Sequence, residues 1–120
     1  MKQIKVTEAT NIQIDWLVST LTNPEWDYED RAYNTFDWVD TGDTNDEQYS
    51  PSTEWSQGGP IIEREKITIS DSLESWAAGY NGTLRYFGPT PLIAAMRCFC
   101  CSKLGDVVDV PEELCQQQSS

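Results

Sequence analysis

The sequence predicts an α+β fold in which a small antiparallel sheet carries packed helices, similar to an α-β-α sandwich. Two segments repeat apolar residues at helical spacing, and one pair of strand-like runs flanks a strong turn signal. Strands and helices are mixed along the chain, which is typical of a layered α+β domain. We expect the 120 residues to form a single domain over residues 1–114, with a disordered tail at 115–120.

The N-terminal part is expected to form a short strand and then a helix. Apolar and polar residues alternate over residues 3–6, as they do in a half-buried strand. Thr7 is the expected N-cap of a helix over residues 8–22, because Glu8 then lies in the first turn, where the helix dipole favours an acid. One face of this helix carries the apolar residues Ile14, Leu17, Val18 and Leu21.

A β-hairpin is predicted after a strand at residues 66–70. Asn81-Gly82 is the strongest short signal for a two-residue hairpin turn. Such a turn predicts that Tyr80 pairs with Thr83, Ala78 with Arg85, and Trp76 with Phe87. One face of the hairpin would then carry Trp76, Ala78, Tyr80, Thr83, Arg85 and Phe87.

The clearest helix of the sequence begins at Thr90-Pro91, an N-cap followed by a proline in the first helical turn. Gly105 is its expected end, and Val107–Val110 is an expected final strand. The core-facing residues of the helix would be Leu92, Ile93, Met96, Phe99 and Cys100.

Residues 49–65, YSPSTEWSQGGPIIERE, contain Gly58-Gly59-Pro60 between two helix-like halves. The glycines do not have the spacing of a nucleotide-binding loop. Pro60 could therefore lie in the first turn of a helix that restarts after Gly59, or inside one kinked helix over about 51–65. Ser50 is the expected cap of this segment.

The charge of the chain excludes some classes of partner. Eight basic residues stand against 20 acidic ones, and the net charge is −12. Duplex nucleic acid and anionic membranes are therefore not expected partners. The acids concentrate in an aromatic insertion at 23–48, which we expect to be irregular, partly docked, and mobile around 40–48.

No residue set indicates catalysis, a cofactor or a metal. The chain has no histidine, so a His-based triad and His-ligated zinc are excluded. Asp40-Thr41-Gly42 is interpreted as an acidic turn, and Cys98, Cys100 and Cys101 as reduced packing residues on a helix. The N-terminus turns polar at once, and we expect neither a secretory segment nor a membrane span.

Two sequence blocks resemble the small NinX-type proteins of lambdoid bacteriophages. They are YSPSTEWSQGGPIIERE and GPTPLIAAMRCFCCSKLGDVVDVPEEL, and the opening MKQIKVTEATNIQIDWLV is similar to the same family. A more distant likeness is to phage proteins described as α-β-α sandwiches. The resemblance covers residues 1–22 and 49–114, and is loose over 23–48. It implies a phage protein that acts in the host cytoplasm, with no established activity or catalytic residues.

The first functional hypothesis is a non-enzymatic binder of a small anionic, nucleotide-like ligand that counters host defence. Hydroxyl groups at a helix N-terminus favour an anion, and aromatic rings can flank a base. Plain helix capping by Ser50, with Trp55 in the core, is an equally open interpretation. The expected ligand-binding residues are Tyr49, Ser50, Ser52, Thr53, Trp55, Arg64, Trp76, Arg85 and Arg97.

The second hypothesis is a protein-binding module. The acidic insertion at 23–48 would be steered towards a basic surface of a host protein. A merely solubilising loop is the other interpretation of the same residues. An enzyme is not expected, and the sequence leaves a homo-oligomer open.

Overall fold

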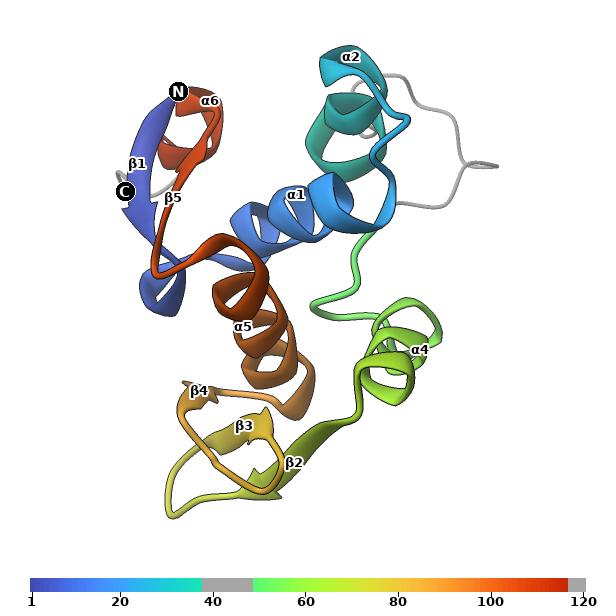
Figure 1. The fold of residues 1–120 in the computed structure, drawn as a ribbon. Helices are drawn as coiled ribbons and strands as arrows, with labels where there is room; N and C mark the ends of the chain where they lie inside the picture. The colour runs from blue at the N-terminus through green and yellow to red at the C-terminus, as the bar shows by residue number, and fades with distance from the viewer. Residues whose placement is uncertain (38–48, 117–120) are drawn as a thin grey trace.

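The computed structural model describes residues 1–37 and 49–116. The longest of the described helices, α5, lies at the centre of the fold (Figure 1). The α+β class is confirmed, and the strands form two antiparallel sheets at opposite ends of α5. One sheet has the order β2-β3-β4, and the other pairs the first strand with the last. The main elements are β1 (Lys2–Lys5), α1 (Asn11–Thr22), α4 (Trp55–Glu65), β2 (Ile67–Asp71), β3 (Trp76–Tyr80), β4 (Tyr86–Gly88), α5 (Pro91–Leu104) and β5 (Val107–Val110).

Helix α5 has the predicted boundaries because each end carries its expected signal. The Thr90 hydroxyl accepts a hydrogen bond from the Ile93 N–H at 3.1 Å, and Pro91 occupies the first turn. Gly105 closes the helix with φ 94°, a conformation that favours glycine. The helix is buried on almost every side, through Leu92, Ile93, Ala94, Ala95, Met96, Cys98, Phe99, Cys100 and Cys101.

The start of α1 corrects the predicted cap. The chain forms a short 3-10 helix, η1 (Val6–Glu8), and α1 begins only at Asn11. Thr10 is the N-cap, because Gln13 allows a reciprocal pair of bonds. The Thr10 N–H donates to Gln13 Oε1 at 2.9 Å, and the Gln13 N–H donates to Thr10 Oγ1 at 3.4 Å. Thr7 is exposed within η1 and does not cap the helix.

Replacing Thr10 by Ala is expected to lower the free energy of unfolding by about 1 kcal/mol, the usual cost of losing an N-cap. The matched change Thr7→Ala is expected to change it by less than about 0.5 kcal/mol, as for exposed side chains without a special contact. Urea denaturation of the two variants beside the wild type measures both values. Equal losses in the two variants would contradict the assignment of the cap.

The hairpin turn forms as predicted. Asn81 and Gly82 have φ values of 57° and 79°, the two positive values that a type I′ turn requires. The Thr83 N–H donates to the Tyr80 carbonyl at 3.0 Å. The predicted pairing of residues is therefore present next to the turn.

Further from the turn the predicted register is wrong by one residue. The Arg85 N–H donates to the Ala78 carbonyl at 3.1 Å, yet the strand ladder also pairs Ala78 with Tyr86, so two residues oppose one in a β-bulge. The returning chain crosses Gly79 so closely that a Cβ atom there would lie 1.5 Å from a backbone oxygen. Because of the bulge, Phe87 lies opposite Ala77 and Gly88 lies opposite Trp76.

Of the two alternatives for Gly58-Gly59-Pro60, the structure shows one continuous helix with Pro60 inside α4. The helix begins at Trp55 rather than near residue 51. Ser50 does not cap it. The Ser50 carbonyl instead accepts from the N–H groups of Thr53 and Glu54 at 3.0 and 2.9 Å and closes a turn before the helix. Pro60 has no N–H, so one helical hydrogen bond is missing.

The first part of the insertion is helical rather than irregular. It forms α2 (Tyr28–Ala32) and a π-helical turn, η2 (Tyr33–Asp37). The Arg31 guanidinium lies 5.4 Å from the centre of the Trp16 ring and donates to the Trp26 carbonyl at 2.8 Å, which docks α2 on α1. The expected mobile part at 40–48 lies outside the described residues.

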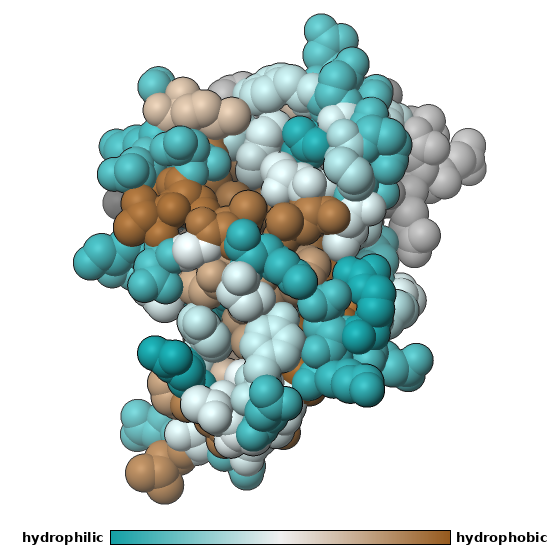
Figure 2. Space-filling view, in the orientation of Figure 1, coloured by the Kyte–Doolittle hydropathy of each residue, from teal (hydrophilic) through white to brown (hydrophobic). Residues whose placement is uncertain are grey.

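Regular secondary structure extends beyond residue 114, the expected end of the domain. Helix α6 (Glu112–Gln116) covers the first two residues of the expected tail, and residues 117–120 lie outside the described part. On the face shown in Figure 2, hydrophobic residues gather in a band over the β1–β5 sheet and the adjoining end of α1. None of the helices in the described ranges combines the length and apolar character that crossing a membrane requires.

Candidate functional site

The segment Tyr49–Ser52 is held against α1. The Tyr49 hydroxyl lies 2.6 Å from Thr22 Oγ1, and its ring packs edge-on against Trp26 with centroids 5.5 Å apart. Ser52 is fully buried, and its hydroxyl donates to the Asn11 carbonyl at 3.3 Å. The side-chain hydroxyls of Tyr49 and Ser52 therefore both have partners on α1.

Asp15 is a buried acid that the sequence analysis missed. Its side chain is 2% exposed, and its carboxylate accepts from the Ser52 N–H at 2.9 Å. Burial raises the pKa of Asp15 to about 7, while the hydrogen bonds from Ser52 lower it. The signal available in the sequence was the single acid within the apolar run Ile14–Val18. Such a residue must find a polar partner on another segment.

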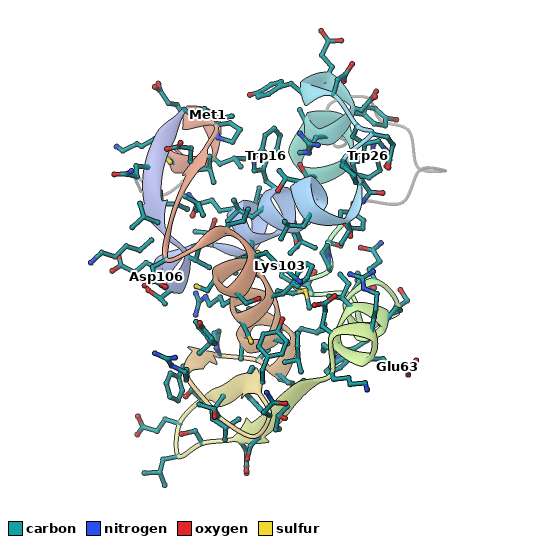
Figure 3. The ribbon with its side chains drawn as sticks, in the orientation of Figure 1. Met1, Trp16, Trp26, Glu63, Lys103 and Asp106 are labelled. Carbon is teal, nitrogen blue, oxygen red and sulfur yellow. The ribbon has the colours of Figure 1, made fainter. Side chains whose placement is uncertain are left out.

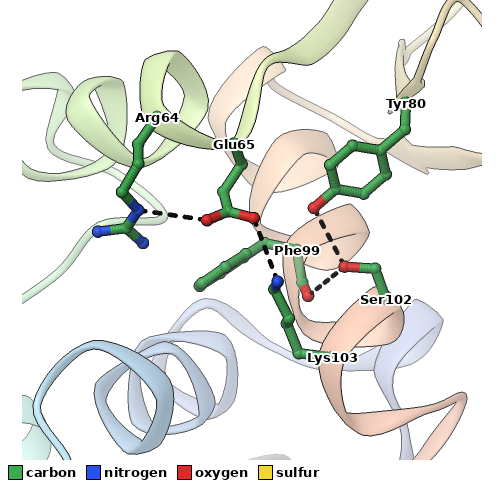
Figure 4. A network of polar contacts seen from close by, with 6 residues as sticks. All are labelled: Arg64, Glu65, Tyr80, Phe99, Ser102 and Lys103. Carbon is green, nitrogen blue, oxygen red and sulfur yellow. Dashed lines mark hydrogen bonds and ion pairs between the residues drawn. The ribbon is translucent and has the colours of Figure 1, made fainter.

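The remaining predicted residues on α4 do not complete a pocket with this segment. Trp55 is 55% exposed rather than in the core, and Thr53 is also exposed. Arg64 contacts Glu65 at 3.2 Å, and Lys103 contacts the same carboxylate at 3.4 Å (Figure 4). Both cations therefore already have an anionic partner in Glu65.

Arg85 and Arg97, the other two predicted arginines, lie together in a groove between η1 and β4. The groove has two adjoining hollows of about 480 and 350 Å³, and both are lined by Thr7 and Arg85. We call this feature the Arg85 groove. The first hollow is also lined by Lys5, Tyr86, Asp106 and Val107, and the second by Glu74, Ser75, Phe87, Gly88, Pro89 and Arg97.

The walls of the Arg85 groove are held by hydrogen bonds to backbone carbonyls. Arg97 on α5 donates to the Phe87 carbonyl at 2.8 Å and to the Ala9 carbonyl at 2.9 Å, so it links β4 to the start of α1. The Val6 N–H donates to the Asp106 carbonyl at 2.9 Å, and Asp106 lies beside η1 (Figure 3). Arg97 is therefore a positioning residue for both walls. Its partial burial lowers the pKa of its guanidinium.

The electrostatics of the Arg85 groove differ from those of the whole chain. Lys5, Arg85 and Arg97, three of the eight basic residues, line it against the two acids Glu74 and Asp106. Within the described ranges, the Arg85 guanidinium has neither a hydrogen bond nor an ion pair. An exposed, unpaired guanidinium with five N–H donors is suited to a phosphate or carboxylate.

The sequence could not place the residues that complete this groove. Lys5 and Thr7 arrive through the pairing of β1 with β5, and the bulge sets the positions of Tyr86 and Phe87. Phe87 is 51% exposed. Trp76 is half-buried and packs against the core, and it is not among the groove-lining residues.

The three cysteines of α5, Cys98, Cys100 and Cys101, are free thiols whose burial disfavours the reactive thiolate. Burial raises the pKa of Cys98 to about 12 and that of Cys101 to about 11. Cys100 is fully buried, and burial raises its pKa further. Among the residues with described positions, no cluster of three or more acids or cysteines is arranged to hold a metal ion.

The fold and the Arg85 groove define a small α+β domain with a basic, aromatic surface groove. A family profile described as Bacteriophage P22, NinX matches residues 5–103, and the chain belongs to this family. The resemblance found in the sequence blocks is thereby confirmed, and the chain is a bacteriophage protein. No curated protein matches the chain. The more distant likeness to phage α-β-α sandwich proteins stays a prediction.

Proposed function

We propose that this NinX-family protein binds a small anionic, nucleotide-like ligand in the Arg85 groove, without converting it. The observation that carries the proposal is the unpaired guanidinium of Arg85 beside exposed aromatic surface in a strongly acidic chain. Each hollow has a volume suited to part of a nucleotide-sized molecule. In the host cytoplasm, such binding would sequester a nucleotide signal and so counter host defence.

The groove replaces the site that the sequence favoured. Anion binding at the Tyr49–Trp55 segment has less support, because Ser52 is buried and its polar groups contact α1. Arg64 is paired with Glu65. Arg85 and Arg97 keep their predicted part, Arg85 as the expected anion contact and Arg97 as the residue that positions the walls.

The test is a thermal-shift panel of mononucleotides and linear and cyclic dinucleotides. A ligand at 100 times its Kd should stabilise the native state by about 2.7 kcal/mol, which raises Tm by roughly 10 °C in a domain of this size. Arg85→Glu is expected to weaken binding at least tenfold, because it places a like charge beside the anion. Its own Tm should stay near that of the wild type, since Arg85 is exposed.

The matched control is Arg64→Glu, which reverses the charge of an exposed arginine outside the groove and is expected to leave the affinity unchanged. Equal affinity of wild type and Arg85→Glu would overturn the groove as the site. The absence of any shift across the whole panel would overturn nucleotide binding itself.

A second candidate function is binding of a basic host protein surface through the acidic insertion. The observation that favours it is the docking of α2 on α1 by Arg31, which leaves Asp27, Glu29 and Asp30 exposed. A row of exposed acids on an anchored helix can steer a basic partner. A phage phenotype that survives Arg85→Glu and is lost when these three acids are made neutral would favour this candidate over the first.

A further inference from the structure

The two hollows of the Arg85 groove offer separate space on either side of one charged residue. Their linings have only Thr7 and Arg85 in common, so these two residues form the boundary between them. A ligand confined to one hollow would leave the other side of Arg85 unused. A longer ligand could place its anionic centre at Arg85 and extend into both hollows.

Each hollow contains one aromatic ring of β4. Tyr86 lines the hollow that contains Lys5, and Phe87 lines the hollow that contains Glu74. They are consecutive residues of β4, the edge strand of its sheet, and each lines a different hollow. The groove therefore presents two aromatic surfaces with a guanidinium between them, and base–aromatic stacking is a common contact for unpaired bases.

The polar residues at the boundary suit a phosphodiester. The guanidinium of Arg85 can donate two parallel N–H bonds to two phosphate oxygens. The Thr7 hydroxyl is exposed, and it has no hydrogen bond with any residue of the described ranges, so it can donate a further bond. The outer ends differ, since Lys5 favours an additional negative charge and Glu74 accepts hydrogen bonds from an amino-bearing base.

We infer that the ligand class of the Arg85 groove is a dinucleotide, with its phosphodiester at Arg85 and Thr7 and one base in each hollow. The inference rests on the proposed function. The inference goes beyond that function because it specifies two bases and places the phosphate between them. The base in the hollow of Phe87 is the one nearer Glu74, and the base in the hollow of Tyr86 is the one nearer Lys5.

Calorimetric titration with pApA, pGpG, their cyclic counterparts, AMP and GMP tests the inference. At least one dinucleotide is expected to bind with a stoichiometry of one per chain and at least tenfold more tightly than its mononucleotide. Phe87→Ala should remove that advantage and Phe87→Tyr should restore it, because both rings offer a stacking surface. Trp55→Ala is the control, since Trp55 is an equally exposed aromatic residue outside the groove.

The outcomes separate the inference from the function on which it rests. Equal affinities for mononucleotides and dinucleotides, both lost in Arg85→Glu, would overturn the dinucleotide and leave nucleotide binding in place. No binding of any probe would overturn both. A loss in Trp55→Ala with no loss in Phe87→Ala would place the ligand on the Tyr49–Trp55 segment and overturn the inference.

Discussion

At pH 8, replacing Asp15 by Asn is expected to raise the free energy of unfolding by roughly 3–4 kcal/mol. Asp15 is buried with no cation paired to it among the described residues, and burial raises its pKa from 3.8 to about 7. The ionised form is therefore costly in the native state and harmless in the unfolded chain. Asn keeps an oxygen that can accept from the Ser52 N–H, and it carries no charge.

The sign of the pH dependence follows from the same shift. Below about pH 4 both states hold the proton on Asp15, and the penalty is absent. Between about pH 4 and 7 Asp15 is ionised in the unfolded chain and protonated in the native state. Each pH unit in this range therefore lowers the folding equilibrium constant about tenfold. Above about pH 7 Asp15 is ionised in both states, and its titration lowers the stability no further.

Urea denaturation of wild type and Asp15→Asn from pH 4 to 8 measures this effect as the difference between the two curves. Other carboxylates titrate in both proteins, so they cancel in the difference. The two proteins should have similar stability at pH 4 and diverge as the pH rises. Parallel curves would show that Asp15 is not titrating with a raised pKa.

Gly58→Ala is expected to lower the free energy of unfolding by about 3 kcal/mol, and the neighbouring change Gly59→Ala to change it by less than about 1 kcal/mol. A Cβ atom at Gly58 would lie 2.4 Å from the Pro51 carbonyl oxygen and 2.6 Å from Leu92 Cδ2. At Gly59 the nearest atom is 3.9 Å away, on Trp55. Alanine there meets no other segment and gains helix propensity, while the steric restriction on a helical residue before Pro60 opposes that gain.

The two variants share the same helix and the same chemical change, so each is the control for the other. Thermal and urea denaturation give the two differences in stability. Equal stability of the variants would contradict the close packing of α4 on the Pro51 turn and α5. The expected contrast also accounts for the Gly58-Gly59 pair without a phosphate-binding role. Gly58 allows close contact between segments, and Gly59 is replaceable.

Elements with strong local signals were predictable from the sequence. Helix α5 has both of its predicted ends because Thr90-Pro91 and Gly105 act within one turn of the helix. The turn at Asn81-Gly82 formed for the same reason. Thr10 was missed although its capping-box partner stands three residues later, because the acid at Glu8 favoured Thr7 instead.

Features that depend on contacts between distant segments were not predictable. The bulge before β4 accompanies a close crossing of the chain at Gly79, and no local sequence pattern indicates that crossing. The partner of Asp15 is a backbone N–H 37 residues away. In the groove, Arg85 and Arg97 were named from their chemistry, whereas Lys5 and Thr7 required knowledge that the first strand pairs with the last.

The pairing of β1 with β5 joins two segments that lie far apart along the chain. Lys2 is opposite Val110, so β1 has no strand partner until the ribosome has added β5. Until then the wall of the groove that carries Lys5 and Thr7 has no strand to hold it. A nascent chain can form local helices earlier. The Arg85 groove can therefore be completed only after β5 has been synthesised, and polypeptides that end before β5 would lack this wall.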